Sequence, residues 1–419
     1  MVNTFRSLRV VTLILPPLVA ARMSAQTRDC DGHFTALAVP AGFCVRLFAD
    51  SVGPVRQVVV HPSGQIVAAL NESPGLIRLR DSNADGRADE IVRFGPGQGG
   101  TGVTWRAGWL YFAADGGVVR YRWPAGSPAP DTTEEWIAKR LPVGNYGSAH
   151  TMKGIAVGAD GAVYLSIGSA SDNCQLQDRT SRSPGRWPCT ELDTRGGVWR
   201  FVPPAVPGDP WPMQRFATGL RNAEALAFDP ATGRLWGATH GRDDLSGQWG
   251  WTDSVSANQP AEMLELLVEN GDYGWPYCHG DWTRSQTRLV RAPEYANQPG
   301  IDCGAMTQPV IGFPAHWAPM AIAVVNSAAA QVPHPGLFIA FHGSRGRRPL
   351  SEDGHYLMFV PLDESGHPAG DYRVILYSTA AAGALRPSGV AVSIGGSIYV
   401  TDDEHQRIYL IEPRPPKSP

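Results

Sequence analysis

The sequence has almost no net charge, and this absence narrows the classes of partner. Its 36 Lys and Arg residues are balanced by 39 Asp and Glu residues, which gives a formal net charge of -3 at pH 7. A basic excess is the electrostatic signature of proteins that bind nucleic acid or anionic membranes. After residue 25 the sequence also lacks any apolar run of the ~20 residues that a transmembrane helix needs. We therefore expect no nucleic-acid partner and no insertion into a membrane.

Metal and haem motifs built on cysteine are also missing. No cysteines are spaced as in a CxxC metal site, and no CxxCH haem-attachment motif occurs. The segment YCHG, residues 277–280, contains only the final Cys-His pair of such a motif. We therefore expect an electron acceptor to be a separate molecule, such as a cytochrome or a quinone.

The six cysteines that are present fit an oxidising compartment. They fall into three couples that are close in sequence, which makes these couples the economical prediction among the possible connectivities. The predicted disulfides are Cys30–Cys44, Cys174–Cys189 and Cys278–Cys303.

The N-terminal segment agrees with export. Arg6 and Arg9 precede an apolar run over residues 10–20, and small residues follow at positions 24 and 25. This order of a charged region, a short apolar region and small residues is typical of a signal peptide. We expect residues 1–25 to be a signal peptide and the mature protein to be periplasmic or secreted.

One pattern recurs six times: a β-branched strand, a turn around glycine and a second apolar strand. The 47 glycines and 36 prolines follow no low-complexity period, so they suit many separate turns. A small antiparallel meander cannot bury both faces alone, but meanders packed face to face around an axis can. The sequence therefore predicts an all-β fold, a six-bladed β-propeller over residues 26–413 with a C-terminal tail at 414–419. The six copies span residues 55–70, 101–114, 152–168, 223–239, 320–343 and 387–403.

Long insertions interrupt the middle repeats at residues 169–198, 240–262 and 271–317, and they are rich in Trp, Pro, Gly and Cys. Loops on such a scaffold commonly carry the functional residues. We expect these insertions to form walls over an axial site, cross-linked by two of the predicted disulfides.

Polar residues stand where the repeats are expected to meet the channel. His150 precedes the third repeat in a loop of small polar residues, which suits a proton acceptor near neutral pH. Arg221 and Asn222 hold the equivalent place in the fourth repeat, and Arg386 in the sixth, where a guanidinium offers a forked donor for carboxylates. His342 ends an apolar strand of the fifth. Taken singly, each of these residues is equally compatible with an ordinary structural or loop role.

A separate acidic turn follows the first repeat. Its sequence, DSNADGRADE, has the D-x-N-x-D-G spacing in which alternating side-chain oxygens wrap one calcium ion. A structural calcium site and a solvated acidic turn are equal alternatives here. The candidate ligands are Asp81, Asn83, Asp85 and, in place of the missing distal glutamate of an EF-hand, Asp89 or Glu90.

Several motifs together resemble the glucose/sorbosone dehydrogenase family, six-bladed propellers that include PQQ-dependent soluble sugar dehydrogenases. The resemblance covers roughly residues 40–412, and NGDYGWPYC and FHGS are its more specific parts, whereas GADGAVYL is typical of propellers in general. In chain order the motifs are GADGAVYLSIGS, GLRNAEALAFDP, HGRDDL, NGDYGWPYC, PAHWAP, FIAFHGS and RPSGVAVSIGGSIYVTDD.

The resemblance implies roles for individual residues. His150 would be the general base, and the backbone carbonyls of Gly241 and Arg242 would hold a calcium ion that also binds the quinone. His342 stands where the family has a lysine, and Ser388 replaces one of a pair of arginines, so the family's pattern is incomplete here. The implied cofactor contacts come from Arg221, Asn222, His342, Arg386 and, covering the ring, Trp317.

The implied protein is an exported PQQ- and Ca²⁺-dependent oxidoreductase that oxidises an aldose sugar or related alcohol by hydride transfer to the quinone. Two alternatives are a calcium-dependent lactonase and a non-catalytic glycan-binding propeller. A lactonase would require several Asp, Glu and Asn side chains to converge on the channel. Because this chain instead places His and Arg at the repeat starts, the sequence favours the quinone enzyme.

Overall fold

The apolar repeats form six antiparallel sheets, one for each predicted blade. The computed structural model describes residues 26–27, 36–143, 150–283, 286–325, 335–363, 365–379 and 385–413. The first three blades comprise β4 (Val55–Val60), β5 (Ile66–Leu70), β6 (Leu76–Arg80) and β7 (Glu90–Phe94); β8 (Gly100–Arg106), β9 (Trp109–Ala114), β10 (Gly117–Arg122) and β11 (Glu135–Lys139); and β12 (Ile155–Val157), β13 (Val163–Ile167), β14 (Gly197–Phe201) and β15 (Met213–Thr218). The last three comprise β16 (Ala225–Phe228), β17 (Leu235–Thr239), β18 (Glu262–Leu267) and β22 (Ile311–Phe313); β23 (Pro319–Val325), β24 (Gly336–His342), β25 (His355–Pro361) and β26 (Arg373–Ser378); and β27 (Pro387–Val392), β28 (Ile398–Asp402), β29 (Arg407–Pro413) and β3 (Phe43–Ala49).

The innermost strands β4, β8, β12, β16, β23 and β27 each contact the next, and together they line one axial channel. This ring confirms the predicted six-bladed β-propeller. Each blade also has an outer fourth strand that the repeat pattern did not predict. In the sixth blade that strand is β3, which pairs with β29 and so joins the two ends of the propeller chain.

The second strand of a blade is buried on both faces because neighbouring blades cover it on each side. Every residue of β5, β13 and β17 is buried, which explains why these segments are almost continuously apolar and do not alternate. Apolar burial between blades is therefore the main stabilising interaction of the ring.

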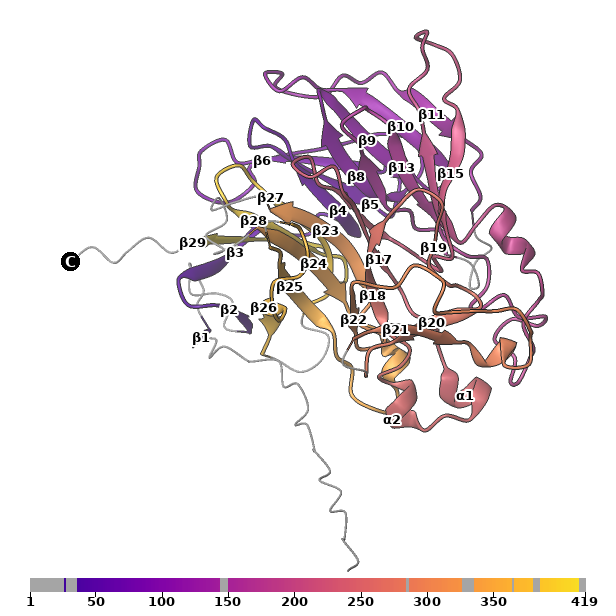
Figure 1. The fold of residues 1–419 in the computed structure, drawn as a ribbon. Coiled ribbons are helices and arrows are strands. Elements are labelled where there is room, and N and C mark those ends of the chain that lie inside the picture. Colours follow the sequence, from indigo (N-terminus) through magenta and orange to yellow (C-terminus); the bar gives the residue numbers. More distant parts are fainter. Residues whose placement is uncertain are drawn as a thin grey trace, which may run out of the picture.

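The predicted insertions carry most of the remaining structure. In Figure 1, α1, α2 and the hairpin β20–β21 lie together at one side of the propeller. These elements are α1 (Leu245–Trp249), α2 (Asp253–Ser256), β19 (Gly271–Asp272), β20 (Cys278–Asp281), β21 (Arg288–Arg291) and the short 3₁₀ helices η1 (Thr190–Asp193), η2 (Pro293–Tyr295) and η4 (Arg345–Arg347), while β1 (Gln26–Thr27) and β2 (Leu37–Val39) extend the fifth blade.

Two of the predicted disulfides are present, Cys174–Cys189 and Cys278–Cys303, and both cross-link insertions. Cys30, the predicted signal peptide and the tail at 414–419 lie outside the described residues, so the Cys30–Cys44 pair and the signal peptide stay predictions.

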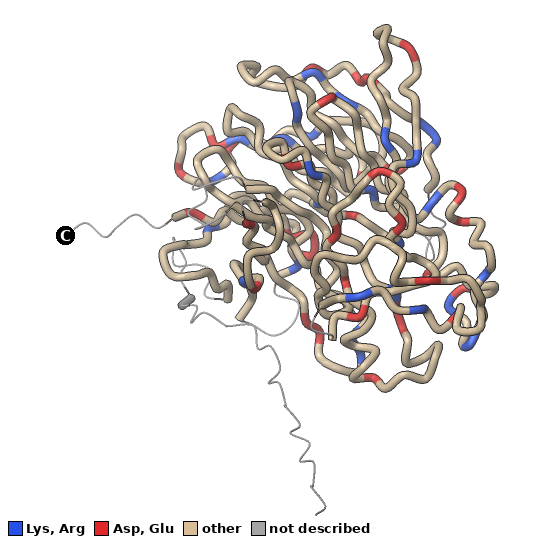
Figure 2. The backbone as a smooth tube through the Cα atoms, in the orientation of Figure 1, with Lys and Arg blue, Asp and Glu red and all other residues tan. Residues whose placement is uncertain are grey.

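Charged residues of both signs are interspersed along the backbone (Figure 2), in agreement with the small net charge. Within the described ranges no helix has both the length and the apolar character to cross a membrane.

Candidate functional site

A cavity of about 580 Å³ opens at one end of the axial channel. Five of the residues predicted from sequence line it: His150, Arg221, Gly241, His342 and Arg386. The first and second strands of each blade run antiparallel. The start of the first strand and the end of the second therefore lie at the same end of the propeller, and these residues occupy those positions. The blade ends therefore bring together residues that are up to 236 positions apart in the sequence.

His150 presents one basic nitrogen. The hydroxyl of Ser169 donates to the carbonyl of Ser171 at 2.6 Å, so its oxygen is left to accept from His150 Nδ1 at 2.9 Å. The neutral imidazole then carries its proton on Nδ1 and its lone pair on Nε2. Burial, followed by the charges of Arg221 and His240, holds the pKa of His150 well below its usual value. The ring is therefore neutral at pH 7 and able to accept a proton.

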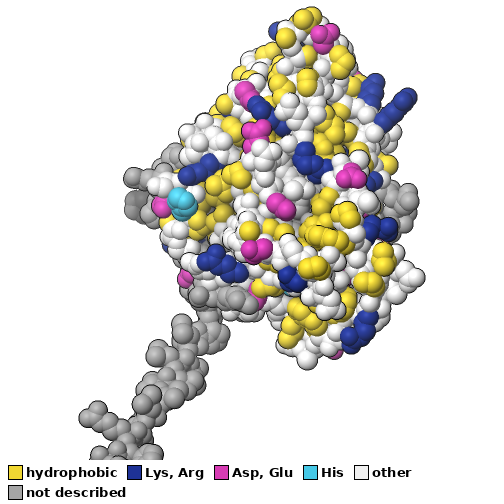
Figure 3. All heavy atoms as spheres, turned by 45° about the vertical axis from the view of Figure 1, so that its right-hand side comes forward, with side chains coloured by type: hydrophobic (Ala, Val, Ile, Leu, Met, Phe, Trp, Pro, Cys, Tyr) yellow, Lys and Arg dark blue, Asp and Glu magenta, His cyan; other side chains and the backbone are white. Residues whose placement is uncertain are grey.

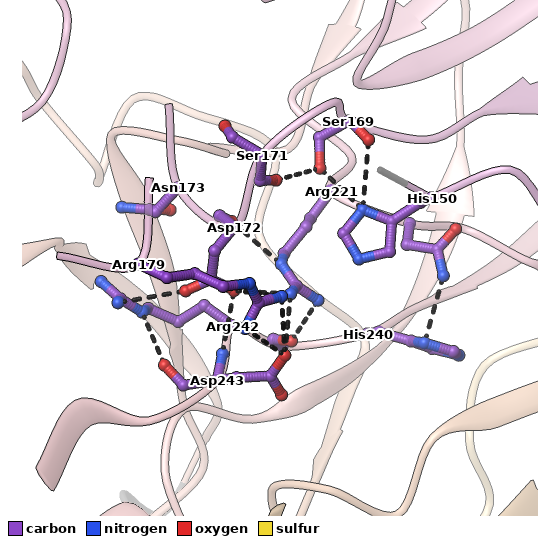
Figure 4. Close-up of polar contacts among 12 residues, drawn as sticks. His150, Ser169, Ser171, Asp172, Asn173, Arg179, Arg221, His240, Arg242 and Asp243 are labelled. Carbon is purple, nitrogen blue, oxygen red and sulfur yellow. Dashed lines mark hydrogen bonds and ion pairs between the residues drawn. The ribbon is translucent and has the colours of Figure 1, made fainter. Parts of the chain in front are cut away.

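Arg221 is the centre of a buried ion-pair network beside His150, shown in Figure 4. Its Nη2 lies 2.6 Å from Asp172 Oδ1 and 3.2 Å from Asp243 Oδ2. Its Nη1 donates to the Gly241 carbonyl at 2.7 Å. These contacts fix the guanidinium in the cavity wall.

The same contact bears on the implied calcium site. Arg221 Nη1 already donates to the Gly241 carbonyl, so a calcium ion bound there would share this oxygen with a cationic guanidinium. The side chain of Arg242 is directed away from the cavity, where it pairs with Glu294 and, at 3.2 Å, with Asp172. Among the described residues, no cluster of three or more His, Cys, Asp and Glu side chains is arranged to hold a metal ion. The calcium assignment to Gly241 and Arg242 stays a prediction.

Asn222 lies in the wall beside His150 and not among the residues that line the cavity. His240 Nε2 lies 2.9 Å from the Pro319 carbonyl, and His240 Nδ1 lies 3.2 Å from Asn222 Nδ2. Asn222 Oδ1 is buried and has no partner among the described residues. An unpaired buried amide oxygen of this kind is open to a ligand donor.

Trp317 does not lie in the cavity, contrary to the prediction. It is buried between blades, with its ring 5.2 Å from Tyr356 and 5.7 Å from Phe341, both edge-on. The preceding residue, His316, has a left-handed backbone (φ 67°) and takes the place in the cavity wall instead. Adjacent side chains point in opposite directions here, so the motif PAHWAP contributes its histidine and not its tryptophan.

We expect Trp317→Phe to lower the free energy of unfolding by about 2 kcal/mol, because the smaller ring leaves a cavity between the blades. Affinity for a ligand of the axial cavity should stay within twofold of wild type. Urea unfolding measures the change in stability, and a ligand titration measures the change in affinity. A large loss of affinity with an unchanged free energy of unfolding would show that Trp317 belongs to the binding site.

Several residues that line the cavity were not predicted from the sequence. Arg56 is the most informative, because it occupies in the first repeat the place of Ser388 in the sixth, and comparing the repeats position by position would have found it. Ser388 itself is fully buried and bonds the Val55 carbonyl at 3.0 Å. The other missed residues are His240, Asp243, Glu262, His316 and Glu404.

His316 and Asp243 form an ion pair in the cavity wall, with Nδ1 and Oδ1 3.6 Å apart. Burial acts to lower the pKa of His316, but the hydrogen bond to Asp243 and the negative charge of that carboxylate raise it. His316 Nε2 also lies 3.1 Å from an acceptor, the Ser256 carbonyl. The two contacts favour the protonated form of His316 beside Arg221.

His342 and Arg56 share one carboxylate on the opposite side of the cavity. His342 Nε2 lies 2.9 Å from Asp403 Oδ1, and Arg56 pairs with Asp403 and, at 2.7 Å, with Glu224. Although burial acts to raise it, the hydrogen bond from His342 and the charge of Arg56 lower the pKa of Asp403 to about 2. Arg386 completes this side through Glu352 at 2.9 Å.

The cavity wall also contains donors that nothing satisfies. Arg56 Nε and Arg386 Nε are buried and, within the described residues, have no hydrogen-bond partner. Buried donors without a partner cost free energy unless a ligand or water meets them. Arg386 Nε lies 3.7 Å from the Glu404 carboxylate. The guanidinium groups of Arg56, Arg221 and Arg386 in the cavity wall suit a ligand that carries carboxylates.

The four residues of the acidic turn do come together between β6 and β7. The side chain of Asp81 accepts from the backbone N–H groups of Asp85 and Gly86 at 3.2 and 2.8 Å, and Asp89 accepts from Ser82 at 2.6 Å. These bonds form the turn whether or not a cation is bound. The turn is remote from the cavity lining, and its calcium assignment stays a prediction.

Comparisons with known proteins place the chain in a recognisable group. The family model described as TrAA12-like matches residues 37–414. A calcium structure of the Trichoderma reesei carbohydrate-active enzyme of family AA12 has a TM-score of 0.73 and 18% identity, covering 90% of this chain and 97% of that one. The holo PQQ domain of pyranose dehydrogenase from Coprinopsis cinerea has a TM-score of 0.72 and 17% identity, covering 90% and 97%.

A third structure is more distant in shape. The PQQ-bound aldose sugar dehydrogenase of Streptomyces coelicolor has a TM-score of 0.54 and 19% identity, covering 90% of this chain and 99% of that one. No curated protein matches the chain by sequence. The neighbours confirm the propeller fold and the predicted resemblance to sugar dehydrogenases.

Proposed function

Because the chain belongs to the TrAA12-like family, we propose that it is a PQQ-dependent oxidoreductase that oxidises an aldose sugar or related alcohol. The observation that carries the proposal is a neutral histidine in a cavity walled by arginines. His150 offers Nε2 as a proton acceptor, while Arg56, Arg221 and Arg386 surround the remaining space. The structural neighbours from Coprinopsis cinerea and Streptomyces coelicolor, which are described as PQQ proteins, support the assignment.

PQQ carries three carboxylates and, when bound, accepts a hydride from the substrate carbon. Arg56 and Arg386, which line the cavity, would pair with carboxylates, and His342 and Asn222 would add polar contacts. Nε2 of His150 would take the hydroxyl proton of the sugar. Arg221 would lie beside this nitrogen and favour negative charge on the substrate oxygen.

The proposal includes calcium, which the resemblance assigns to the carbonyls of Gly241 and Arg242. These carbonyl oxygens are suitable ligands for a hard cation, and the Gly241 oxygen would be shared with Arg221 Nη1. The proposal also includes export, because two disulfides in the described chain suit an oxidising compartment. The electron acceptor is an external molecule.

We expect Arg56→Lys to weaken PQQ binding about tenfold, because an ammonium cannot hold Glu224, Asp403 and a ligand carboxylate at once. Absorbance titration of the purified protein with PQQ measures this directly, without turnover. Arg93→Lys is the matched control, since Arg93 pairs with Glu72 on the surface. Equal PQQ affinity in all three proteins would remove Arg56 from the site.

A further inference from the structure

We propose that the loop of residues 174–189, closed by the Cys174–Cys189 disulfide, is the docking surface for the electron acceptor, a ferric haem protein with an acidic face. The inference rests on the proposed function, because only an oxidoreductase needs to pass electrons on. It goes further by naming the surface and the charge of the partner.

The loop is held in one conformation before any partner arrives. Besides the disulfide, Gln175 and Gly185 form a β-bridge across it. The backbone N–H of Arg182 donates to the Gln248 carbonyl at 2.9 Å, which ties the tip of the loop to α1. A surface that is already ordered loses little conformational entropy on binding, so each of its contacts contributes more to affinity.

The exposed residues of the loop have the composition of a binding hot spot. The side chain of Trp187 is 46% exposed although tryptophan is usually covered, and Leu176 is also exposed. Arg182 and Arg186 are exposed, and no carboxylate of the described residues pairs with either. Trp and Arg are enriched at hot spots of protein interfaces. Figure 3 brings this side of the molecule forward and shows charged side chains of both signs standing among hydrophobic ones.

The loop presents net positive charge, although the whole chain is at -3. Its acidic residue, Asp178, is engaged as the acceptor of the Asp172 N–H at 2.8 Å. Arg182 and Arg186 therefore face solvent uncompensated. A positive patch on a slightly negative molecule orients an acidic partner towards itself during diffusional encounter.

The loop lies directly behind the wall of the axial cavity. Arg179 reaches from the loop to Asp243 at 3.3 Å, and Asp243 lines the cavity (Figure 4). On the other side, the Trp187 ring lies 4.8 Å from that of Tyr277, which packs against the buried Trp275. Trp275 borders the same inner wall as Arg221. Tyr277 and Trp275 therefore connect a partner bound at Trp187 to the inner wall that contains Arg221.

The stoichiometry of the reaction favours short-lived complexes with the acceptor, whose approach is guided by charge. Oxidation of one alcohol carbon to a carbonyl releases two electrons and two protons. A ferric haem accepts one electron and becomes ferrous, so two acceptor molecules must dock in turn for each sugar, and both protons pass to solvent. A small polar patch with an aromatic anchor favours such rapid exchange over a permanent complex.

The test compares two variants, Arg182→Glu/Arg186→Glu and Trp187→Ala, with two controls, Arg122→Glu and Ile394→Ala. Arg122 and Ile394 are exposed at the opposite end of the propeller, Arg122 as the last residue of β10 and Ile394 in the turn after β27. Each PQQ-loaded protein is given sugar and, separately, an uncharged benzoquinone, acidic cytochrome b562 or basic horse-heart cytochrome c as acceptor.

We expect charge reversal to slow reduction of cytochrome b562 by about tenfold or more at low ionic strength, with the loss shrinking as salt is added. Reduction of benzoquinone should not change, and reduction of cytochrome c should rise. Trp187→Ala should slow both cytochromes at every salt concentration. Unchanged cytochrome b562 rates, or equal losses with benzoquinone, would overturn the docking surface.

If wild-type protein reduces no acceptor at all, the proposed function fails and the docking surface is tested by binding alone. Wild-type protein should then broaden the haem NMR signals of ferric cytochrome b562 more than the Arg182→Glu/Arg186→Glu variant does. Equal broadening by both would overturn the inference.

Discussion

Replacing His150 by alanine is expected to lower kcat by about 10²–10⁴-fold, the usual contribution of a general base. The variant removes the one ring nitrogen that the geometry leaves free to take the hydroxyl proton of the sugar. Because His150 contacts Ser169 and does not pair with the arginines, PQQ affinity should change little. Stopped assays of sugar oxidation and an absorbance titration with PQQ separate the two effects.

Ser169→Ala serves as the graded control. It removes the hydroxyl acceptor of His150 Nδ1 at 2.9 Å and leaves the Ser169 carbonyl at 3.3 Å, so the ring is held less firmly but keeps its basic nitrogen. We expect a loss of about tenfold in kcat, far smaller than that of His150→Ala. An equal loss in the two variants would mean that the loop as a whole, and not the imidazole, supports turnover.

The pH profile follows from the same environment. Burial and the charges of Arg221 and His240 depress the pKa of His150, so the neutral form persists below pH 6.5. Activity should therefore stay level as the pH falls from 7 towards 6.5 and decline only at more acidic pH. A decline centred at or above pH 6.5 would contradict a buried base beside Arg221.

Replacing Glu265 by glutamine is expected to stabilise the protein strongly at alkaline pH. Glu265 is buried in β18 without a cationic partner, and its carboxylate accepts from Thr239 Oγ1 at 2.6 Å. Burial raises its pKa from 4.5 to about 8. The folded state therefore holds a proton that the unfolded state releases above pH 4.5, and stability falls as the pH rises between these values.

The difference between the two pKa values lowers the free energy of unfolding by about 5 kcal/mol above pH 8, at 1.36 kcal/mol for each pH unit. Glu265→Gln keeps the shape and the acceptor for Thr239 but cannot ionise. The variant and wild type should unfold at similar urea concentrations at pH 5, and the variant should be much more stable at pH 9. If the difference in the free energy of unfolding between the two proteins does not increase with pH, Glu265 is ionised in the folded state.

The repeats made the propeller predictable, since six copies of one strand pair admit few other arrangements. They did not reveal the fourth strands, because β7 and β11 are short, partly exposed and lack the apolar period of the inner strands. Nor did they reveal that β3 closes the ring. That pairing joins residues more than 350 positions apart, and no local pattern encodes it.

The site was predictable where a residue stands at the start of a repeat. His150, Arg221 and Arg386 were identified in this way, and the structure brings all three to one cavity. The predicted position of Trp317 was wrong because adjacent side chains face opposite sides, and the sequence alone does not show that His316 faces the cavity. The pairing of the three cavity arginines with carboxylates was also hidden, since partners such as Asp172 and Asp403 come from other blades.

The central claim is that His150 is the base of a quinone-dependent sugar oxidation. The most direct measurement is dye reduction by the purified mature protein over a panel of aldoses, with and without added PQQ and Ca²⁺, for wild type and His150→Ala. The account predicts sugar-dependent reduction that requires PQQ and disappears in His150→Ala, although the variant still binds PQQ. Sugar oxidation that persists in the variant, or a wild-type protein that binds no PQQ, would contradict it.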